Sequence, residues 1–365
     1  MRGLQPLALL LGYLRITFKR VWKVYKAIPK IRSSKGANIY INEFLKKNMK
    51  EKTTDTVMMI RPTAFGYNAQ TAGTNAFQKS DERILAKEIH RKALQEFEKA
   101  VAALTTKGIH VITFNERENI RTPDAIFPNN WISFHEDGTV VLYPMFAHNR
   151  RLERRKDIIE TLKKKFDISK ITDLSSHENK GLFLEGTGSL VMDHDKKIAY
   201  ACLSPRTHKT MLTHFEKKLG YKTIYFSASD KKRIPIYHTN VLMMIGKNFS
   251  VICAEAIKNQ KERKKVIQSL EKTGHEIVFI THEQMEHFAG NMLALKNKKG
   301  KHFVAMSRQA FESLFPHQIA ILKRHAEIIT SPIETIEMYG GGSMRCMIAE
   351  IFLPKKKKDN PAKHL

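Results

Sequence analysis

The sequence is poor in cysteine and tryptophan and has no apolar run long enough to cross a bilayer. Its 365 residues include three Cys and two Trp. Three thiols are too few for the disulfide framework of a small secreted protein and do not pair off evenly, so we expect a reducing, cytoplasmic environment. The apolar stretch LQPLALLLGYL near the N-terminus has only about half of the roughly 20 residues that a membrane-spanning helix needs.

Acidic residues are absent from the first 42 positions, which carry nine Lys and Arg. This segment lacks the order of charge, apolar run and small-residue cleavage site that marks a secretory signal. Three interpretations remain: a basic amphipathic helix on an anionic membrane surface, an organelle-targeting peptide, or an extension that plays no part in the activity. We therefore separate a basic N-terminal extension, residues 1–56, from a body that begins at Val57.

The formal net charge of +27 is distributed unevenly along the chain. Residues 1–56 hold thirteen basic and three acidic residues, and a lysine-rich tail, residues 355–365, holds five and one. The other excess charge lies mostly on lysines of helical stretches, which is typical of a solvated face, and aromatic residues are not interleaved with them. We expect no nucleic-acid partner. A non-catalytic protein that binds an anionic surface through its basic ends is the alternative to an enzyme.

Short β-rich runs alternate with amphipathic helical segments between Val57 and Pro354. The repeated unit is strand, strand, helix, strand, and it recurs roughly every 55 residues. The unit starts lie near positions 126, 184, 238, 291 and 343. This pattern predicts an α/β fold in which five ββαβ units, the first split between the two ends of the body, form a fivefold pseudosymmetric propeller. An open α/β sheet is the alternative.

Residues able to do chemistry stand at equivalent points of this repeat. In a ring of repeated units, the segments that begin equivalent strands converge on the axis. Asp124, Glu185 and His238 lie at three of the five starts and Cys346 lies at a fourth, while the remaining segment reads AGNMLAL (289–295). A thiol, an imidazole and two carboxylates can supply a nucleophile, a general acid or base, and a grip on a polar nitrogenous substrate.

The three cysteines differ in their surroundings. Cys202 and Cys253 stand in apolar strand-like runs, where a thiol is usually packed and inert. Cys346 follows a glycine loop and the cation of Arg345, a setting that favours the thiolate. We therefore expect Cys346 to be the reactive thiol.

Motifs for metals and cofactors fail on spacing. The histidines of HEQMEH (282–287) are five residues apart, whereas a zinc-binding helix needs a separation of four. Neither GGGSMR nor EGTGSL continues as a phosphate-binding loop or a dinucleotide fingerprint. We expect neither a metal nor an organic cofactor.

Five motifs together resemble the amidinotransferase and arginine deiminase superfamily, and within it most closely the citrulline-utilisation hydrolases. They are MIRPTAFGYNAQTAGTNAFQ, PDAIFPNNWISFH, LEGTGSLVMD, YHTNVLMMIG and GGGSMRCMIAEIFLP. The similarity covers Val57 to Pro354. It implies a propeller of five α/β units with the active site on its axis, no cofactor, and a small amino-acid substrate. The sequence leaves open whether the protein is a monomer or a homo-oligomer.

The resemblance also implies roles for individual residues. Cys346 would be the nucleophile, His238 the acid and base, and Glu185 would orient His238 and a substrate nitrogen. Asp124 and Asn130 would bind the substrate.

One residue departs from the arginine deiminase pattern. Two positions after the catalytic histidine those enzymes have an aspartate, and this chain has Asn240. An amide removes a negative charge and adds a donor for a carbonyl, so Asn240 favours a ureido substrate such as citrulline over a guanidinium. Arg61 or Arg345 would bind the substrate carboxylate. The alternative is a guanidine-modifying enzyme that acts on arginine or a modified arginine, as a deiminase, dihydrolase or amidinotransferase.

Overall fold

The computed structural model describes residues 53–79, 81 and 84–356. The basic extension predicted over residues 1–56 therefore lies outside the described residues except for its last four, and so does most of the lysine-rich tail. Among the described residues, no helix combines the length and the apolar character that a membrane span requires.

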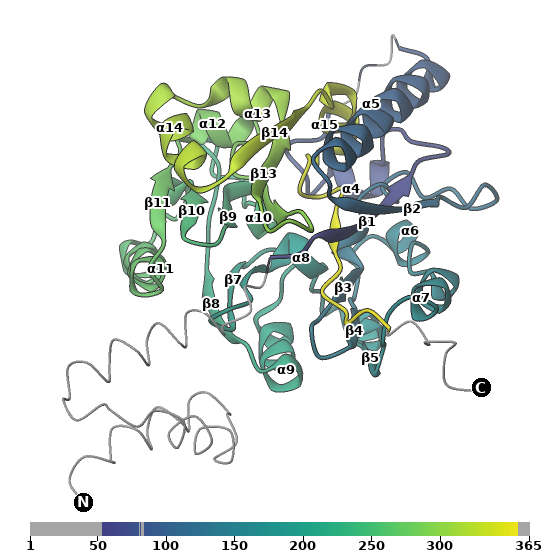
Figure 1. The fold of residues 1–365 in the computed structure, drawn as a ribbon, viewed down its shortest axis with the longest axis horizontal. Helices are drawn as coiled ribbons and strands as arrows, with labels where there is room; N and C mark the ends of the chain where they lie inside the picture. The colour runs from purple at the N-terminus through teal and green to yellow at the C-terminus, as the bar shows by residue number, and fades with distance from the viewer. Residues whose placement is uncertain (1–52, 80, 82–83, 357–365) are drawn as a thin grey trace, which may run out of the picture. The chain divides into compact units, whose positions relative to one another are not determined.

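The strands form five three-stranded sheets with one shared topology (Figure 1). In each sheet the middle strand pairs antiparallel with one neighbour and parallel with the other. The first sheet is β15 (Ala349–Glu350), β1 (Thr56–Arg61) and β2 (His110–Asn115); the second is β3 (Ile132–Phe134), β4 (Thr139–Leu142) and β5 (Lys170–Asp173); the third is β6 (Val191–Asp193), β7 (Ile198–Cys202) and β8 (Lys222–Phe226); the fourth is β9 (Met243–Ile245), β10 (Phe249–Ile252) and β11 (Glu276–Phe279); the fifth is β12 (Leu293–Lys296), β13 (His302–Ser307) and β14 (Glu327–Ser331). The predicted α/β class and the strand, strand, helix, strand order are confirmed.

Each parallel pair is joined by a crossover helix, as a parallel connection requires. The five crossover helices are α5 (Ala86–Thr106), α7 (Lys156–Lys163), α9 (Lys209–Leu219), α11 (Gln260–Lys272) and α14 (Pro316–His325). Figure 1 shows them on the outside of the strands, with α8 (Gly186–Ser189) and α10 (Thr239–Leu242) near the middle. The other short helices are α4 (Ala69–Ala72), α6 (His148–Arg151), α12 (His282–Glu286), α13 (Arg308–Ser313) and α15 (Glu334–Gly340), with 3₁₀ turns η1 (Pro128–Asn130), η2 (Ser175–Lys180) and η3 (Ala254–Ala256).

The apolar core lies between neighbouring sheets. Side chains of β1 alternate along the strand: Val57 and Met59 pack with residues of the fifth sheet, whereas Met58 and Ile60 pack with residues of the second. Because successive residues of a strand point to opposite faces, a strand buried on both faces reads as the continuous apolar run VMMI.

The predicted strand starts differ from the observed ones in a regular way. Where strands were expected to begin near residues 126, 184 and 238, the chain first makes one short helical turn, η1, α8 or α10, and the strand follows. A turn of three or four residues is too short to show a helical period in the sequence. As a consequence, Glu185 and His238 are the residues immediately before α8 and α10.

The segment before β12 packs tightly against the backbone of α10. A Cβ built on Gly290 would lie 2.3 Å from the carbonyl oxygen of Val241. We therefore expect Gly290→Ala to lower the free energy of unfolding by about 1–3 kcal/mol through overpacking. Urea unfolding would measure the change.

Gly73→Ala is the matched control. Gly73 is exposed, has a φ of −61°, and a Cβ there would have no described atom within 4 Å. Equal losses in the two variants would contradict the close approach at Gly290.

Candidate active site

Glu185 and His238 form a buried hydrogen-bonded pair. Their side chains come from the third and fourth repeats and are 0% and 2% exposed. Nε2 of His238 donates to Oε2 of Glu185 over 2.8 Å. A neutral imidazole that donates from Nε2 has its lone pair on Nδ1. The pair therefore presents a base atom on the side of the ring away from the carboxylate.

Gly188 leaves space beside this base atom. A Cβ at position 188 would lie 2.8 Å from Nδ1 of His238 and 2.5 Å from Nδ2 of Asn130. Both distances are shorter than packed atoms allow. The second glycine of EGTG is thus explained by the close approach of both Asn130 and His238 to its Cα.

Glu185 is charged although it is fully buried. Oε1 accepts from the backbone N–H of Phe146 over 2.9 Å, and Oε2 lies 3.5 Å from Nη1 of Arg206. Burial alone would raise the pKa of Glu185, but Arg206 and the hydrogen bond from His238 lower it to about 2. Burial lowers the pKa of His238 to about 4. At neutral pH the pair is therefore a carboxylate and a neutral imidazole.

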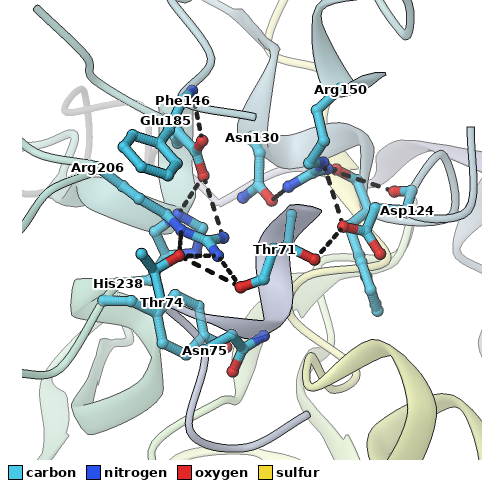
Figure 2. A network of polar contacts seen from close by, with 12 residues as sticks. Thr71, Thr74, Asn75, Asp124, Asn130, Phe146, Arg150, Glu185, Arg206 and His238 are labelled. Atoms are coloured by element: carbon cyan, nitrogen blue, oxygen red, sulfur yellow. Dashed lines mark hydrogen bonds and ion pairs between the residues drawn. The ribbon is translucent and has the colours of Figure 1, made fainter. Parts of the chain in front are cut away.

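Arg206, which follows β7, connects Glu185 to α4 and the residues after it. Its guanidinium donates to the backbone oxygen of Thr71 over 2.9 Å and to Oγ1 of Thr74 over 2.7 Å, and it lies 5.0 Å from the ring centre of Tyr237. Figure 2 shows Arg206 between Glu185 and the two threonines. Arg206 is 2% exposed, so it serves as a fixed counter-charge for Glu185.

The hydrogen bonds that Asp124 makes with the described residues use only one of its two carboxylate oxygens. Its Oδ2 accepts from Nδ2 of Asn68 over 2.8 Å and from Oγ1 of Thr71 over 3.1 Å, and lies 3.7 Å from Nε of Arg150. Its Oδ1 is buried and has no hydrogen-bond partner among the described residues. A buried carboxylate oxygen without a donor costs free energy unless a ligand or water supplies one. Asp124 can therefore accept a hydrogen bond from a substrate.

Asn130 is held by a second buried arginine. Nη1 of Arg150 donates to Oδ1 of Asn130 over 2.6 Å, and Nδ2 of Asn130 donates to Asn129 over 2.9 Å. Figure 2 shows Arg150 between Asn130 and Asp124. Arg150 also binds both oxygens of Glu153 at 2.9 Å, and burial raises the pKa of Glu153 to about 8 against the attraction of that guanidinium.

The thiol of Cys346 is buried between two carboxamides. The side chain is 3% exposed, and its backbone N–H bonds to the oxygen of Ser343 over 2.9 Å, which closes the turn after the glycine loop. Nδ2 of Asn240 lies 3.4 Å from Sγ and Nδ2 of Asn291 lies 3.3 Å from it. Amide N–H groups directed at sulfur favour the thiolate.

Asn240 lies on α10, two residues after His238, and its two amide atoms differ in their contacts. The donor atom contacts Sγ of Cys346, whereas Oδ1 is buried without a partner in the part of the chain that the structure describes. From the sequence, Asn240 was expected to donate to a substrate carbonyl. In this geometry the atom left for a substrate is an acceptor.

The two arginines predicted to bind the substrate carboxylate have partners of their own. Arg61 forms an ion pair with Glu98 at 2.6 Å, in which the two side chains are 40% and 51% exposed. Arg345 binds Glu350 at 2.7 Å and the backbone oxygen of Ile348 at 2.9 Å. The described contacts bring neither arginine to Glu185, His238 or Asp124, and the role predicted for them stays a prediction.

Sequence reasoning missed Asn291, Arg150 and Arg206. Asn291 lies in AGNMLAL, the one repeat start without an ionisable side chain, and a search for neutral hydrogen-bonding residues at equivalent positions would have found it. Arg150 and Arg206 occupy no equivalent position of the repeat, and their roles depend on contacts with distant residues.

The other two cysteines are inert by comparison. Burial raises the pKa of the Cys202 and Cys253 thiols to about 12. Cys253, Glu255 and His282 do offer ligand atoms within 4.8 Å of one another. The ammonium group of Lys258 lies 3.3 Å from Nε2 of His282, so a cation already occupies one side of that ring.

The low pKa of His238 predicts a specific acid sensitivity. An unfolded histidine takes up a proton near pH 6.5, whereas folded His238 does so only near pH 4. Its contribution to stability is therefore complete above pH 6.5 and is lost as the pH falls toward 4. At about pH 5 the loss is about 2 kcal/mol. Urea unfolding of wild type and His238→Gln at neutral pH and at about pH 5 should show a smaller loss in the variant by this amount. Identical pH dependence would contradict a neutral His238.

Comparisons with known proteins give a family and a fold. Residues 61–353 match the family model described as N,N dimethylarginine dimethylhydrolase, eukaryotic, whereas no curated protein matches the chain. The structure resembles the N-terminal domain of ArgZ, an arginine dihydrolase from the ornithine–ammonia cycle in cyanobacteria, bound to product: 14% identity, TM-score 0.63, 82% of this chain and 99% of that one. It also resembles unliganded AgrE, with 15% identity and a TM-score of 0.65 over 83% of this chain and 40% of that one.

A third solved structure is a dimethylarginine dimethylaminohydrolase variant in an adduct with S-methyl-L-thiocitrulline, with 14% identity and a TM-score of 0.54 over 82% of this chain and 100% of that one. These likenesses establish the fold, and the family match covers most of the described residues. The chain therefore belongs to the family of eukaryotic-type N,N-dimethylarginine dimethylhydrolases.

Proposed function

We propose that the protein is a cysteine hydrolase that cleaves the terminal C–N bond of a ureido amino acid, converting citrulline to ornithine, ammonia and carbon dioxide. This function corresponds to the citrulline-utilisation branch of the superfamily. The observation that carries it is the thiol of Cys346, which contacts two carboxamides and no described carboxylate. The reacting carbon of the substrate would then lie among neutral groups, as a neutral ureido group prefers.

The carboxylates of the site support the same choice of substrate. Glu185 has Arg206 at 3.5 Å and Asp124 has Arg150 at 3.7 Å, and both arginines are buried. Glu153 shares Arg150, which donates to both of its carboxylate oxygens over 2.9 Å. The two buried arginines thus compensate most of the negative charge of these carboxylates. A guanidinium would gain less from such a site than from one with unpaired carboxylates.

The chemistry would proceed in two steps. His238, neutral at pH 7 because of its lowered pKa, takes the thiol proton of Cys346, and the thiolate attacks the ureido carbon. His238 returns the proton to the leaving nitrogen, and ammonia departs from a thiocarbamate ester. His238 then takes a proton from water, which attacks the ester and frees the thiol. The resulting carbamate loses carbon dioxide and leaves ornithine.

Two unpaired acceptors would hold the substrate during these steps. Oδ1 of Asp124 and Oδ1 of Asn240 are buried and lack a described partner, and the terminal nitrogens of a ureido group carry the matching N–H donors. Glu185 would keep the imidazole of His238 in the tautomer with its lone pair on Nδ1.

Guanidine hydrolysis is the second candidate. The family is named for the hydrolysis of dimethylarginine. Among the similar solved structures, AgrE has been solved with L-arginine and with ornithine. A guanidinium donates N–H bonds only, which also suits the unpaired oxygens of Asp124 and Asn240. The same thiol would attack the guanidino carbon of arginine or a modified arginine.

We also propose that the five sheets close into the predicted propeller and that residues 57–354 are its catalytic body. Shared apolar clusters support closure: they join the first sheet to the second, the second to the third, the third through the fourth to the fifth, and the fifth to the first. The family match over residues 61–353 supports the boundaries.

Cys346→Ser should abolish turnover and leave the fold intact, because a serine hydroxyl in this site is a far weaker nucleophile. Cys202→Ser and Cys253→Ser, the matched controls, should keep turnover and lower the free energy of unfolding by about 1–3 kcal/mol, since each buries a hydroxyl in an apolar cluster. Ammonia release and circular dichroism would measure the two effects. Turnover by Cys346→Ser would contradict the mechanism.

Ammonia release with citrulline and with arginine, offered separately, should favour citrulline and yield ornithine. Asn240→Asp restores a negative charge beside the thiol and should shift the ratio of kcat/KM toward arginine by on the order of tenfold or more. Release from arginine alone by the wild type would favour the guanidine candidate and remove the ureido assignment.

A further inference from the structure

The buried side chain of Asn291 contacts the sulfur of Cys346 and the backbone on both sides of it. It is 0% exposed and lies two residues before β12, at the fifth repeat start. Its Nδ2 donates to the backbone oxygen of Asn240 over 2.9 Å and lies 3.3 Å from Sγ of Cys346. Its Oδ1 accepts from the backbone N–H of Arg345 over 3.0 Å. One side chain thus binds both segments that flank the thiol.

These backbone contacts fix which amide atom faces which neighbour. If the amide were reversed, Nδ2 would meet the N–H of Arg345 and Oδ1 would meet the carbonyl oxygen of Asn240. Donor would then face donor and acceptor would face acceptor, both buried, at a cost of several hydrogen bonds. The second N–H of Asn291 is therefore held toward Sγ of Cys346.

The two amides at the thiol are not equivalent. Oδ1 of Asn240 has no partner among the residues that the structure describes, so the Asn240 amide can reorient toward a substrate. Asn291 has protein partners on both amide atoms. Its donor stays with the sulfur whether or not a substrate is bound.

Other charged groups do not replace this donor. His238 carries no charge until it takes the thiol proton, because burial lowers its pKa to about 4. Arg206, Arg150 and Arg345 are bound to Glu185, Glu153 and Glu350. Among the described residues, the hydrogen-bond contacts of Sγ are with Asn240 and Asn291. A buried thiolate without a cation depends on hydrogen-bond donors.

We infer that Asn291 is a further catalytic residue, whose fixed N–H stabilises the thiolate of Cys346 and aligns it for attack. The inference rests on the proposed function only in taking Cys346 as the nucleophile, and it holds for a ureido or a guanidino substrate. The Oδ1 atom of Asn291 also lies 3.7 Å from Sγ. When the thiol of Cys346 is protonated, its S–H can therefore donate to the same amide.

The test is the pH profile of Cys346 alkylation by iodoacetamide, followed by mass spectrometry of the peptide that contains Cys346. Only the thiolate reacts, so the midpoint of the profile reports its stability. Asn291→Ala should raise the midpoint by about one pH unit and slow alkylation at neutral pH about tenfold. A structural role alone would leave the midpoint unchanged.

Asn75→Ala is the matched control. Asn75 is a buried asparagine whose Nδ2 donates to the backbone oxygen of Gly341 over 3.2 Å, so it supports the same glycine loop without touching sulfur. Its midpoint should equal that of the wild type. Asn291→Asp is the second variant. It keeps an acceptor for the N–H of Arg345 and places an acceptor beside the sulfur, so its midpoint should rise at least as far.

The outcomes separate the two proposals. An unchanged midpoint in folded Asn291→Ala or Asn291→Asp would overturn the role of Asn291 and leave the proposed function standing. Wild-type protein in which Cys346 is not alkylated at any pH would overturn the assignment of the nucleophile, and with it the proposed function. A raised midpoint in both Asn291 variants, with Asn75→Ala unchanged, would support the inference even if neither citrulline nor arginine were turned over.

Discussion

Glu185 is a buried negative charge, and the arrangement of the reacting groups depends on how that charge is held. Arg206 supplies the counter-charge, Phe146 supplies a backbone N–H, and His238 donates the third contact. Because Arg206 is itself bound to Thr71 and Thr74, the carboxylate ties the third repeat to the fourth and to the first. The orientation of the His238 imidazole therefore depends on contacts made by several repeats.

The repeat architecture brings the polar side chains of the site together, because they occupy equivalent positions of successive units. Each unit ends a loop with one buried residue before its first strand or short helical turn, and the five sheets share apolar clusters with their neighbours. Polar side chains at those positions are buried, and several of them contact one another. Buried polar groups there must be satisfied by partners, and the unpaired oxygens of Asp124 and Asn240 are where a substrate would complete the network.

Much of the scaffold and part of the site could be predicted from the sequence. The helices α9 and α11 end next to Gly220 and just before Gly274, and both glycines have positive φ, so glycine marks in the sequence where these helices stop. The turns α8 and α10 were not predicted, because four residues carry no period. Arg206 was missed for another reason: its contacts with Glu185, Thr71 and Thr74 join segments that are separate in the sequence, and no local pattern encodes them.

The pairing of β1 with β15 determines when, during synthesis and folding, the site around the thiol of Cys346 forms. The hydroxyl of Thr54 bonds to the backbone oxygen of Ile351, 297 positions further along the chain, and β15 directly follows the loop that carries Cys346. Contacts between such distant segments form late, because the intervening chain must be ordered first. A ribosome-bound chain would thus complete four sheets before the glycine loop emerges, and the sulfur of Cys346 would reach Asn240 and Asn291 only after the segments that carry them have folded. An immature chain carries no assembled nucleophile to react with the metabolites around it.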